Sequence, residues 1–151
     1  MHAYFRTRSD LVDIVLKEVD EHLTTITDAC FLSGTSVYER LFRLALRFGQ
    51  DARDRADLIL VWLDWSTGVR SPVWDRYLFR LDKLHRSVEA VLHEDLGKTL
   101  SAQDISIRAK LYVGGGHTLA LMQFAGATDE EITRTSEDLA RQALLKGRSH
   151  R

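Results

Sequence analysis

The stretch SAQDISIRAKLYVGGGHTLALMQFAGATDEE, residues 101–131, decides the fold that we predict for this chain. It opens on Ser101 with Asp104 three positions later, and it closes on Thr128 with Glu131 three positions later. Both pairs match the capping box, which satisfies the free N–H groups at the start of a helix. The sequence between them is apolar nearly all round and lacks the alternation of a strand. A helix of this kind needs two partners to bury it, and a second subunit can be one of them.

Similar signals mark where the other helices begin. Each precedes apolar residues at spacings of three and four, and they are residues 7–10 (TRSD), 36–39 (SVYE), a weaker acidic form at 51–54 (DARD), and Ser71 followed by Pro72. Together they predict six helices, over residues 9–30, 37–50, 52–68, 72–96, 102–126 and 129–146. Gly97 is placed to end the fourth. We therefore predict an all-α fold, with which the single proline of the chain agrees.

Composition excludes several classes of protein. The 151 residues carry 21 Lys and Arg against 22 Asp and Glu, so no dominant basic field is present to grip nucleic acid. A hydrophobic content of 44% and a charged content of 28% are typical of one folded domain, which we place at 9–146 with a frayed tail at 147–151. Cys30 is the single cysteine, which excludes an internal disulfide and a cysteine-based zinc site. We expect a cytoplasmic protein.

Neither the amino-terminal segment nor the uncharged stretch at residues 111–128 predicts an association with a membrane. Residues 1–10 contain charges and no apolar core, unlike a secretory signal. Residues 111–128 lack charged side chains, but their glycines, His117 and Gln123 are poor choices for facing lipid. We interpret this segment as a helix buried inside the protein.

Glycine and histidine patterns offer several candidate chemical sites. Residues 97–99 (GKT) resemble the end of a phosphate-binding loop but lack its earlier glycine and its strand, so they indicate a helix end. The three glycines at 114–116 indicate either close helix packing or room for a ligand. No histidine pair has the spacing of a metal site, so we expect no metal and no cofactor. His85 and His117 are expected to be partly buried, hydrogen-bonded residues rather than catalysts.

Aromatic residues cluster in the middle of the sequence, where Trp62, Trp65 and Trp74 fall within thirteen positions. Core packing explains such a cluster. An apolar chamber between helices explains it equally well, with polar tips supplied by Ser66, Tyr112, His85 and His117. The arginines of the 37–50 helix are expected to form a solvated face, with Glu39 and Asp51 as partners.

Two segments resemble a known family. The opening HAYFRTRSDLV, residues 2–12, is similar to the junction that closes the helix-turn-helix of TetR-type repressors. The segment VWLDWS, residues 61–66, followed by Arg70 and by Val73 and Trp74, resembles the LuxR/HapR-type quorum-sensing regulators within that family. The similarity extends from residue 2 to about residue 145, and it is weaker over the second and the last predicted helix.

The resemblance implies a TetR-type effector-binding and dimerisation domain. In that family the last two helices pack against their symmetry mates as a four-helix bundle, and the pocket lies among the preceding helices. Residues 1–8 would be the remnant of the helix-turn-helix, whose second helix reads operator DNA, so we expect no operator binding by this chain alone. The subgroup has polar residues where this sequence has Leu81 and His85, so its ligand preference does not transfer.

The resulting hypothesis is a homodimeric, ligand-sensing domain of a TetR-type transcriptional regulator that binds a small apolar or amphipathic effector. The residues predicted to bind the ligand are Phe48, Trp62, Trp65, Tyr77, Leu78, Leu81, His85, Tyr112 and His117. The residues predicted for the dimer interface are Leu119, Gln123, Ile132, Leu139 and Ala143.

Two alternatives remain open. One is a partner without a DNA-reading head that titrates a full-length regulator. The other is a small helical enzyme that uses His85 or His117 as a base.

Overall fold

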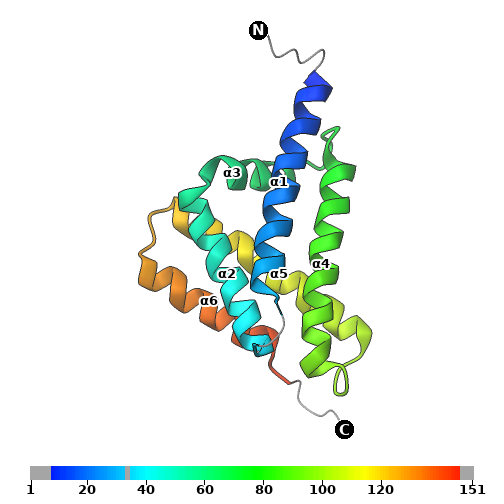
Figure 1. Cartoon of the computed structure of the whole chain (residues 1–151), viewed down its shortest axis with the longest axis vertical. Helices are drawn as coiled ribbons and strands as arrows, with labels where there is room; N and C mark the ends of the chain where they lie inside the picture. Colours follow the sequence, from blue (N-terminus) through cyan, green and yellow to red (C-terminus); the bar gives the residue numbers. More distant parts are fainter. Residues whose placement is uncertain (1–7, 33–34, 147–151) are drawn as a thin grey trace.

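A computed structural model describes residues 8–32 and 35–146, and within these ranges the chain forms helices and no strands, which confirms the predicted all-α fold (Figure 1). The helices are α1 (Arg8–Cys30), α2 (Val37–Asp54), α3 (Ala56–Ser66), α4 (Trp74–Leu96), α5 (Ala102–Phe124) and α6 (Asp129–Ala143). The helix-turn-helix remnant predicted at residues 1–8 lies outside the described residues except for Arg8, which begins α1. The tail predicted at 147–151 also lies outside them, as does Thr7 of the first capping signal.

Three of the predicted start signals are helix N-caps. In each, a hydroxyl oxygen accepts a hydrogen bond of 3.1 Å from the backbone N–H three residues later, at Ser36, Ser101 and Thr128. At the start of α6 the Glu131 carboxylate also accepts from the Thr128 backbone N–H, 3.3 Å away, which completes the capping box. These local bonds explain why α2, α5 and α6 begin where the sequence predicts.

The boundary between the second and third helices differs from the prediction. The acidic run at 51–54 was expected to start a helix, but α2 continues through it to Asp54, and α3 begins at Ala56. Asp51 is not available as a cap because it is buried, at 3% exposed, and its carboxylate accepts hydrogen bonds from His22 (2.6 Å) and Arg47 (3.2 Å). A tertiary contact with α1 therefore overrides the local signal.

Helix ends also move by a few residues. α4 begins at Trp74 instead of residue 72, because Ser71 and Pro72 belong to the preceding turn, where the Ser71 hydroxyl accepts from the Val73 N–H at 3.2 Å. α4 ends at Leu96, directly before Gly97, as predicted. α5 and α6 end at Phe124 and Ala143, earlier than expected. Gly126, with φ of 91°, makes the reversal between them in a conformation that favours glycine.

α5 is the centre of the fold. α2 and α4 pack against it, and α6 packs against both α5 and α2 (Figure 1). Its inward side chains are fully buried, as are the residues that meet them: Ala109, Leu119 and Ala120 of α5, Leu41 of α2, and Val88 and Leu92 of α4. The described residues leave the opposite side of α5 uncovered, since Ile107, Leu111 and Leu121 are 47%, 70% and 59% exposed. The expectation of burial on every side is wrong for the single chain.

The three glycines at 114–116 have three different surroundings. A Cβ at Gly115 would overlap the Leu139 side chain, so α5 and α6 approach closely there. Gly116 faces a cavity, and a Cβ there would lie 3.7 Å from Phe48. Gly114 has no neighbour within 4 Å of such a Cβ. Close packing and space for a ligand, the two predicted explanations, therefore apply to different glycines of the same run.

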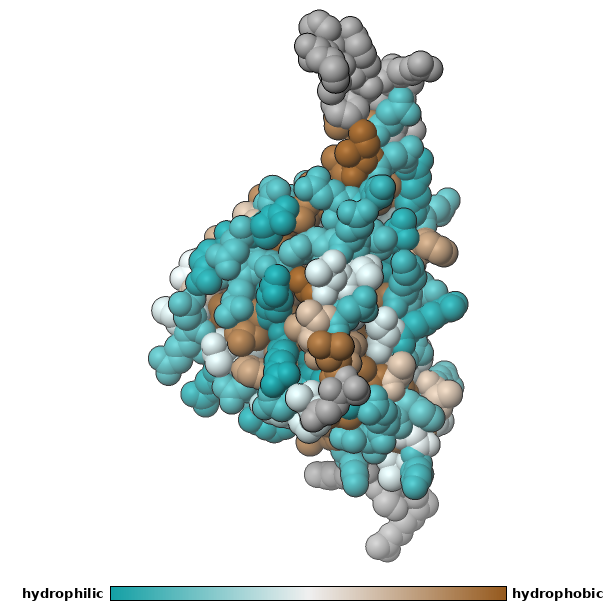
Figure 2. Space-filling view, in the orientation of Figure 1, coloured by the Kyte–Doolittle hydropathy of each residue, from teal (hydrophilic) through white to brown (hydrophobic). Residues whose placement is uncertain are grey.

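Hydrophilic side chains cover most of the face seen in Figure 2, and hydrophobic ones gather near the amino-terminal end of α1. Leu11 and Ile14, in the first turns of α1, are 44% and 50% exposed. Within residues 8–32 and 35–146, no helix combines the length and the hydropathy that a membrane span requires.

Candidate functional site

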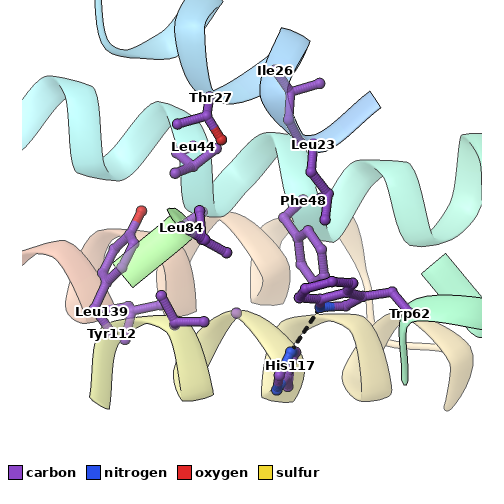
Figure 3. Close-up of a pocket in the computed structure, with 13 residues that line it drawn as sticks. Leu23, Ile26, Thr27, Leu44, Phe48, Trp62, Leu84, Tyr112, His117 and Leu139 are labelled. Atoms are coloured by element: carbon purple, nitrogen blue, oxygen red, sulfur yellow. Dashed lines mark hydrogen bonds between the residues drawn. The ribbon is translucent and has the colours of Figure 1, made fainter. Parts of the chain in front are cut away.

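A small apolar cavity lies where α1, α2, α3, α4 and α5 converge with one residue of α6 (Figure 3). Its volume is about 30 Å³, whereas a cavity needs about 10–15 Å³ by this measure to hold one water molecule. The lining residues are Leu23, Ile26, Thr27, Leu44, Ala45, Phe48, Trp62, Leu84, Tyr112, Val113, Gly116, His117 and Leu139. In this conformation the cavity has room for about two waters. A larger occupant requires lining side chains to move.

Trp62 and His117 form the main polar contact of the cavity wall. The indole Nε1–H of Trp62 donates a hydrogen bond to Nε2 of His117, 2.9 Å away (Figure 3). An acceptor Nε2 requires a neutral imidazole that carries its proton on Nδ1. Burial lowers the pKa of His117 below its ordinary value, and the nearby His85 lowers it further. The cavity therefore has an uncharged wall at neutral pH.

Tyr112 ties α5 to α2 across the cavity. Its hydroxyl donates a hydrogen bond of 2.6 Å to the Leu41 carbonyl oxygen, and its side chain is almost fully buried. Burial raises the pKa of Tyr112 far above its ordinary value, so the hydroxyl keeps its proton. Since that proton is engaged by the backbone, Tyr112 positions the two helices and has only acceptor capacity left for an occupant.

The predicted pocket residues separate into two groups. Phe48, Trp62, Tyr112 and His117 line the cavity, whereas Trp65, Tyr77, Leu78, Leu81 and His85 do not. Tyr77 is buried behind Trp62, with ring centroids 4.7 Å apart, so Trp62 separates it from the cavity. Leu78 is 40% exposed, and Leu81 and His85 are half-buried on α4. Trp65 lies on α3 and the other four on α4, where periodicity does not show that Leu84 is the residue that reaches the cavity.

Sequence reasoning missed most of the remaining lining residues. Leu23, Ile26 and Thr27 come from α1, and Leu44, Ala45, Val113 and Gly116 come from α2 and α5. Leu23, Ile26, Leu44 and Ala45 belong to the apolar stripes that predicted the helices, so their burial was foreseeable. Their position beside a void was not, because a void depends on how well side chains of different helices fit together.

The residues predicted for a dimer interface face into the chain itself. Leu119, Ile132 and Ala143 are 0%, 1% and 6% exposed, so they are core residues without surface for a second copy. Leu139 lines the cavity. Gln123 is half-buried, and its side-chain Nε2 has no hydrogen-bond partner among the described residues. Leu119 of α5 and Ile132 of α6 both lie beside Gly49 of α2, so the faces predicted to meet a second copy are packed against α2 instead.

The arginines of α2 do not form one solvated face. Arg43 and Arg47 pair with Glu39 (3.4 Å) and Asp51 (3.2 Å), the predicted partners. Arg40 instead is 7% exposed and makes a two-pronged contact with the Glu94 carboxylate of α4, at 2.7 and 2.8 Å. This contact holds the pKa of Glu94 below its ordinary value. It joins the beginning of α2 to the end of α4.

The part of the chain that the structure describes contains no candidate metal site, because it has no group of three His, Cys, Asp or Glu side chains that could hold a metal ion. An enzyme that used His117 as a base would need its lone pair, which here accepts the Trp62 hydrogen. His85 is half-buried, and burial lowers its pKa.

Comparison of the chain with protein-family models, curated proteins and solved structures finds no match.

Proposed function

We propose that this chain is the ligand-sensing and self-associating domain of a TetR-type transcriptional regulator. The observation that carries the proposal is an exposed apolar surface on α5, which we call the α5 outer face. It consists of Ile107, Leu111, Gly114, Thr118 and Leu121, and its three large side chains are 47%, 70% and 59% exposed. A contiguous apolar surface of this kind on a folded domain marks an interaction site.

The arrangement of the α5 outer face suits a second copy of the chain. Ile107 and Leu121 lie seven residues before and after Gly114, so an antiparallel copy of α5 would place each against the other across a two-fold axis. Gly114 has no neighbour within 4 Å of an added Cβ, so a partner helix can approach closely at that point. This face replaces the buried residues predicted from sequence as the proposed interface.

A ligand in the cavity has a path to α1. Trp62 packs against Tyr77 with centroids 4.7 Å apart, and Tyr77 stacks on Trp74 at 5.5 Å. Arg76, two residues after Trp74, pairs with Asp13 of α1. An occupant that moves Trp62 would therefore shift the start of α4 relative to α1, provided that it binds the two arrangements with different affinities.

The regulatory role rests on the sequence resemblance together with this architecture. In the TetR family, α1 would continue from the DNA-reading helices, so its displacement would change the spacing of two heads in a dimer. Operator binding is proposed only for a protein that also carries these DNA-reading helices. A role in quorum sensing is proposed from the resemblance alone, and a cytoplasmic location from the composition of the chain.

Light scattering after size-exclusion chromatography tests self-association. We expect a dimer at micromolar concentration and a monomer for Leu111→Glu, because a charge at the centre of the α5 outer face would be buried unpaired. Leu60→Glu is the matched control, since Leu60 is 47% exposed on α3, away from this face, and should leave the dimer intact. A wild-type chain that elutes as a monomer, or a Leu111→Glu chain that stays dimeric, would contradict the proposed interface.

A further inference from the structure

A polar groove between α1 and α4 opens to solvent beside the cavity. We call it the α1–α4 groove, and its volume is about 240 Å³. Its outer walls are Asp20, Thr24 and Asp28 on α1 and Arg80, Lys83 and Ser87 on α4. Figure 1 shows these two helices running alongside each other. The groove is therefore a wider and more polar space beside the narrow apolar cavity.

Three side chains separate the groove from the cavity because they line both. They are Leu23 and Thr27 of α1 and Leu84 of α4. Figure 3 shows Leu23 and Thr27 pointing from α1 into the space that Leu84 enters from α4. Leu84 is only half-buried, so a change of its rotamer would connect the two spaces without unfolding either helix.

The joint between α1 and α4 is held at its surface by ion pairs. Asp20 pairs with Arg80 at 3.3 Å and with Lys83 at 3.9 Å, and Asp13 pairs with Arg76. Asp20 and Arg80 are half-buried, whereas Lys83, Asp13 and Arg76 are exposed. Ion pairs near the surface contribute less to stability than the fully buried apolar packing of α2 and α4 on α5. Opening the α1–α4 joint therefore costs less than separating α5 from α2 or α4.

The charges of the groove are unevenly placed. Arg80 and Lys83 share the single carboxylate of Asp20. Asp28, the other acidic residue of the groove, lies eight residues further along α1, about 12 Å away along the helix axis. The end of the groove at Asp20 therefore has one more cation than anion, directly beside the apolar wall.

We propose that the α1–α4 groove is the access route to the cavity, and that Arg80 and Lys83 bind the anionic head group of a single-chain amphiphile. The alkyl chain passes between Leu23 and Leu84 and displaces Leu84, since the resting cavity of about 30 Å³ cannot hold it. This inference rests on the proposed function and names its ligand class.

Calorimetric titration with three probes of equal chain length tests the head group. Decanoate and decyltrimethylammonium are used below their micelle concentrations and decanol below its solubility limit, and decanoate is expected to bind tightest. Arg80→Gln and Lys83→Gln should each weaken decanoate about threefold, as expected for an exposed ion pair, and leave decanol unchanged. Arg86→Gln is the control, because Arg86 lies on the same helix but pairs with Asp82 outside the groove, at 3.0 Å.

Neighbouring threonines test the route. Thr24 lines the groove but not the cavity, and Thr25 is equally exposed on α1 but lines neither. Thr24→Trp should slow the association of cis-parinarate, a fluorescent single-chain carboxylate, at least severalfold in stopped-flow measurements. Thr25→Trp should not change the rate.

The results of these experiments distinguish a failure of the proposed ligand and access route from a failure of the proposed function. Equal or tighter binding of decanol, or decanoate binding that ignores Arg80→Gln and Lys83→Gln, overturns the anionic head group while leaving a ligand-binding domain in place. Equal association rates for the two tryptophan variants overturn the route. If none of the three amphiphiles binds, the ligand class is wrong, and self-association through the α5 outer face is still judged separately by light scattering.

Discussion

The indole of Trp62 donates its hydrogen bond to a histidine that must be neutral to accept it, and the two residues lie 55 positions apart on α3 and α5. Trp62 is 2% exposed, and the Phe48 and Tyr77 rings pack around the pair. This hydrogen bond joins the α3 wall of the cavity to the α5 wall, and the bond from the Tyr112 hydroxyl to the Leu41 carbonyl joins α5 to α2. A change in the Trp62–His117 hydrogen bond therefore indicates a change in the shape or occupancy of the cavity.

Removing the indole donor is expected to destabilise the fold. Trp62→Phe keeps an aromatic ring but leaves Nε2 of His117 without its partner, which should lower the free energy of unfolding by about 1–3 kcal/mol. Trp65→Phe is the matched control, because Trp65 is half-buried and does not line the cavity, and it should cost less. Urea unfolding followed by circular dichroism measures both. Equal losses for the two variants would contradict a specific role for the hydrogen bond.

The same pair predicts a pH dependence. Because burial lowers the pKa of His117 below the ordinary value of 6.5, the unfolded chain takes up a proton before the folded chain does. The contribution of His117 to stability is therefore full above pH 6.5 and falls as the pH decreases below it. His117→Gln should flatten the loss of unfolding free energy between pH 7 and pH 5. The remaining slope should shrink further in a double variant with His85→Gln, since burial also lowers the pKa of His85. An unchanged slope would show that neither histidine governs it.

Two adjacent glycines on α5 are expected to respond in opposite directions to the same substitution. Gly115→Ala would force its Cβ into the Leu139 side chain and should destabilise by about 1–3 kcal/mol through overpacking. Gly114→Ala meets open space and should stabilise the helix by about 0.5–1 kcal/mol. Thermal and urea unfolding should be measured in a Leu111→Glu background, so that self-association does not enter the comparison. Changes of the same sign would argue against the close approach of α5 and α6.

Asp51 is expected to hold α1 against α2. Its buried carboxylate accepts hydrogen bonds from His22 at 2.6 Å and from Arg47 at 3.2 Å. Asp51→Asn keeps the shape of the side chain but removes its charge, and it should cost about 2 kcal/mol of unfolding free energy, because hydrogen bonds to charged groups are the stronger ones. Asp54→Asn, on the exposed last residue of α2, should have no measurable effect. Hydrogen exchange should show faster opening of α1 in Asp51→Asn, and uniform protection in both variants would count against the link.

Local chemistry made much of the fold predictable. A hydroxyl and an acid three residues apart satisfy the first N–H groups of a helix without any tertiary partner, which is why the starts at Ser36, Ser101 and Thr128 were correct. The same reasoning failed for residues 51–54, because the buried Asp51 accepts a hydrogen bond from His22 of α1, which is 29 residues away in the sequence. Arg40 was misassigned for a similar reason, since its partner Glu94 is 54 residues away.

The sequence by itself determined that residues 8–32 and 35–146 are all-helical, how many helices they form and, within a few residues, where each begins, because capping and periodicity act locally. Tertiary structure alone decided which side of α5 is covered, so that Leu119 is buried and Leu111 exposed. It also decided that Leu84, and not Leu81 or His85, reaches the cavity. These outcomes depend on the rotation of each helix against its neighbours, and apolar residues on two sides of one helix are equally suited to the core until packing selects between them.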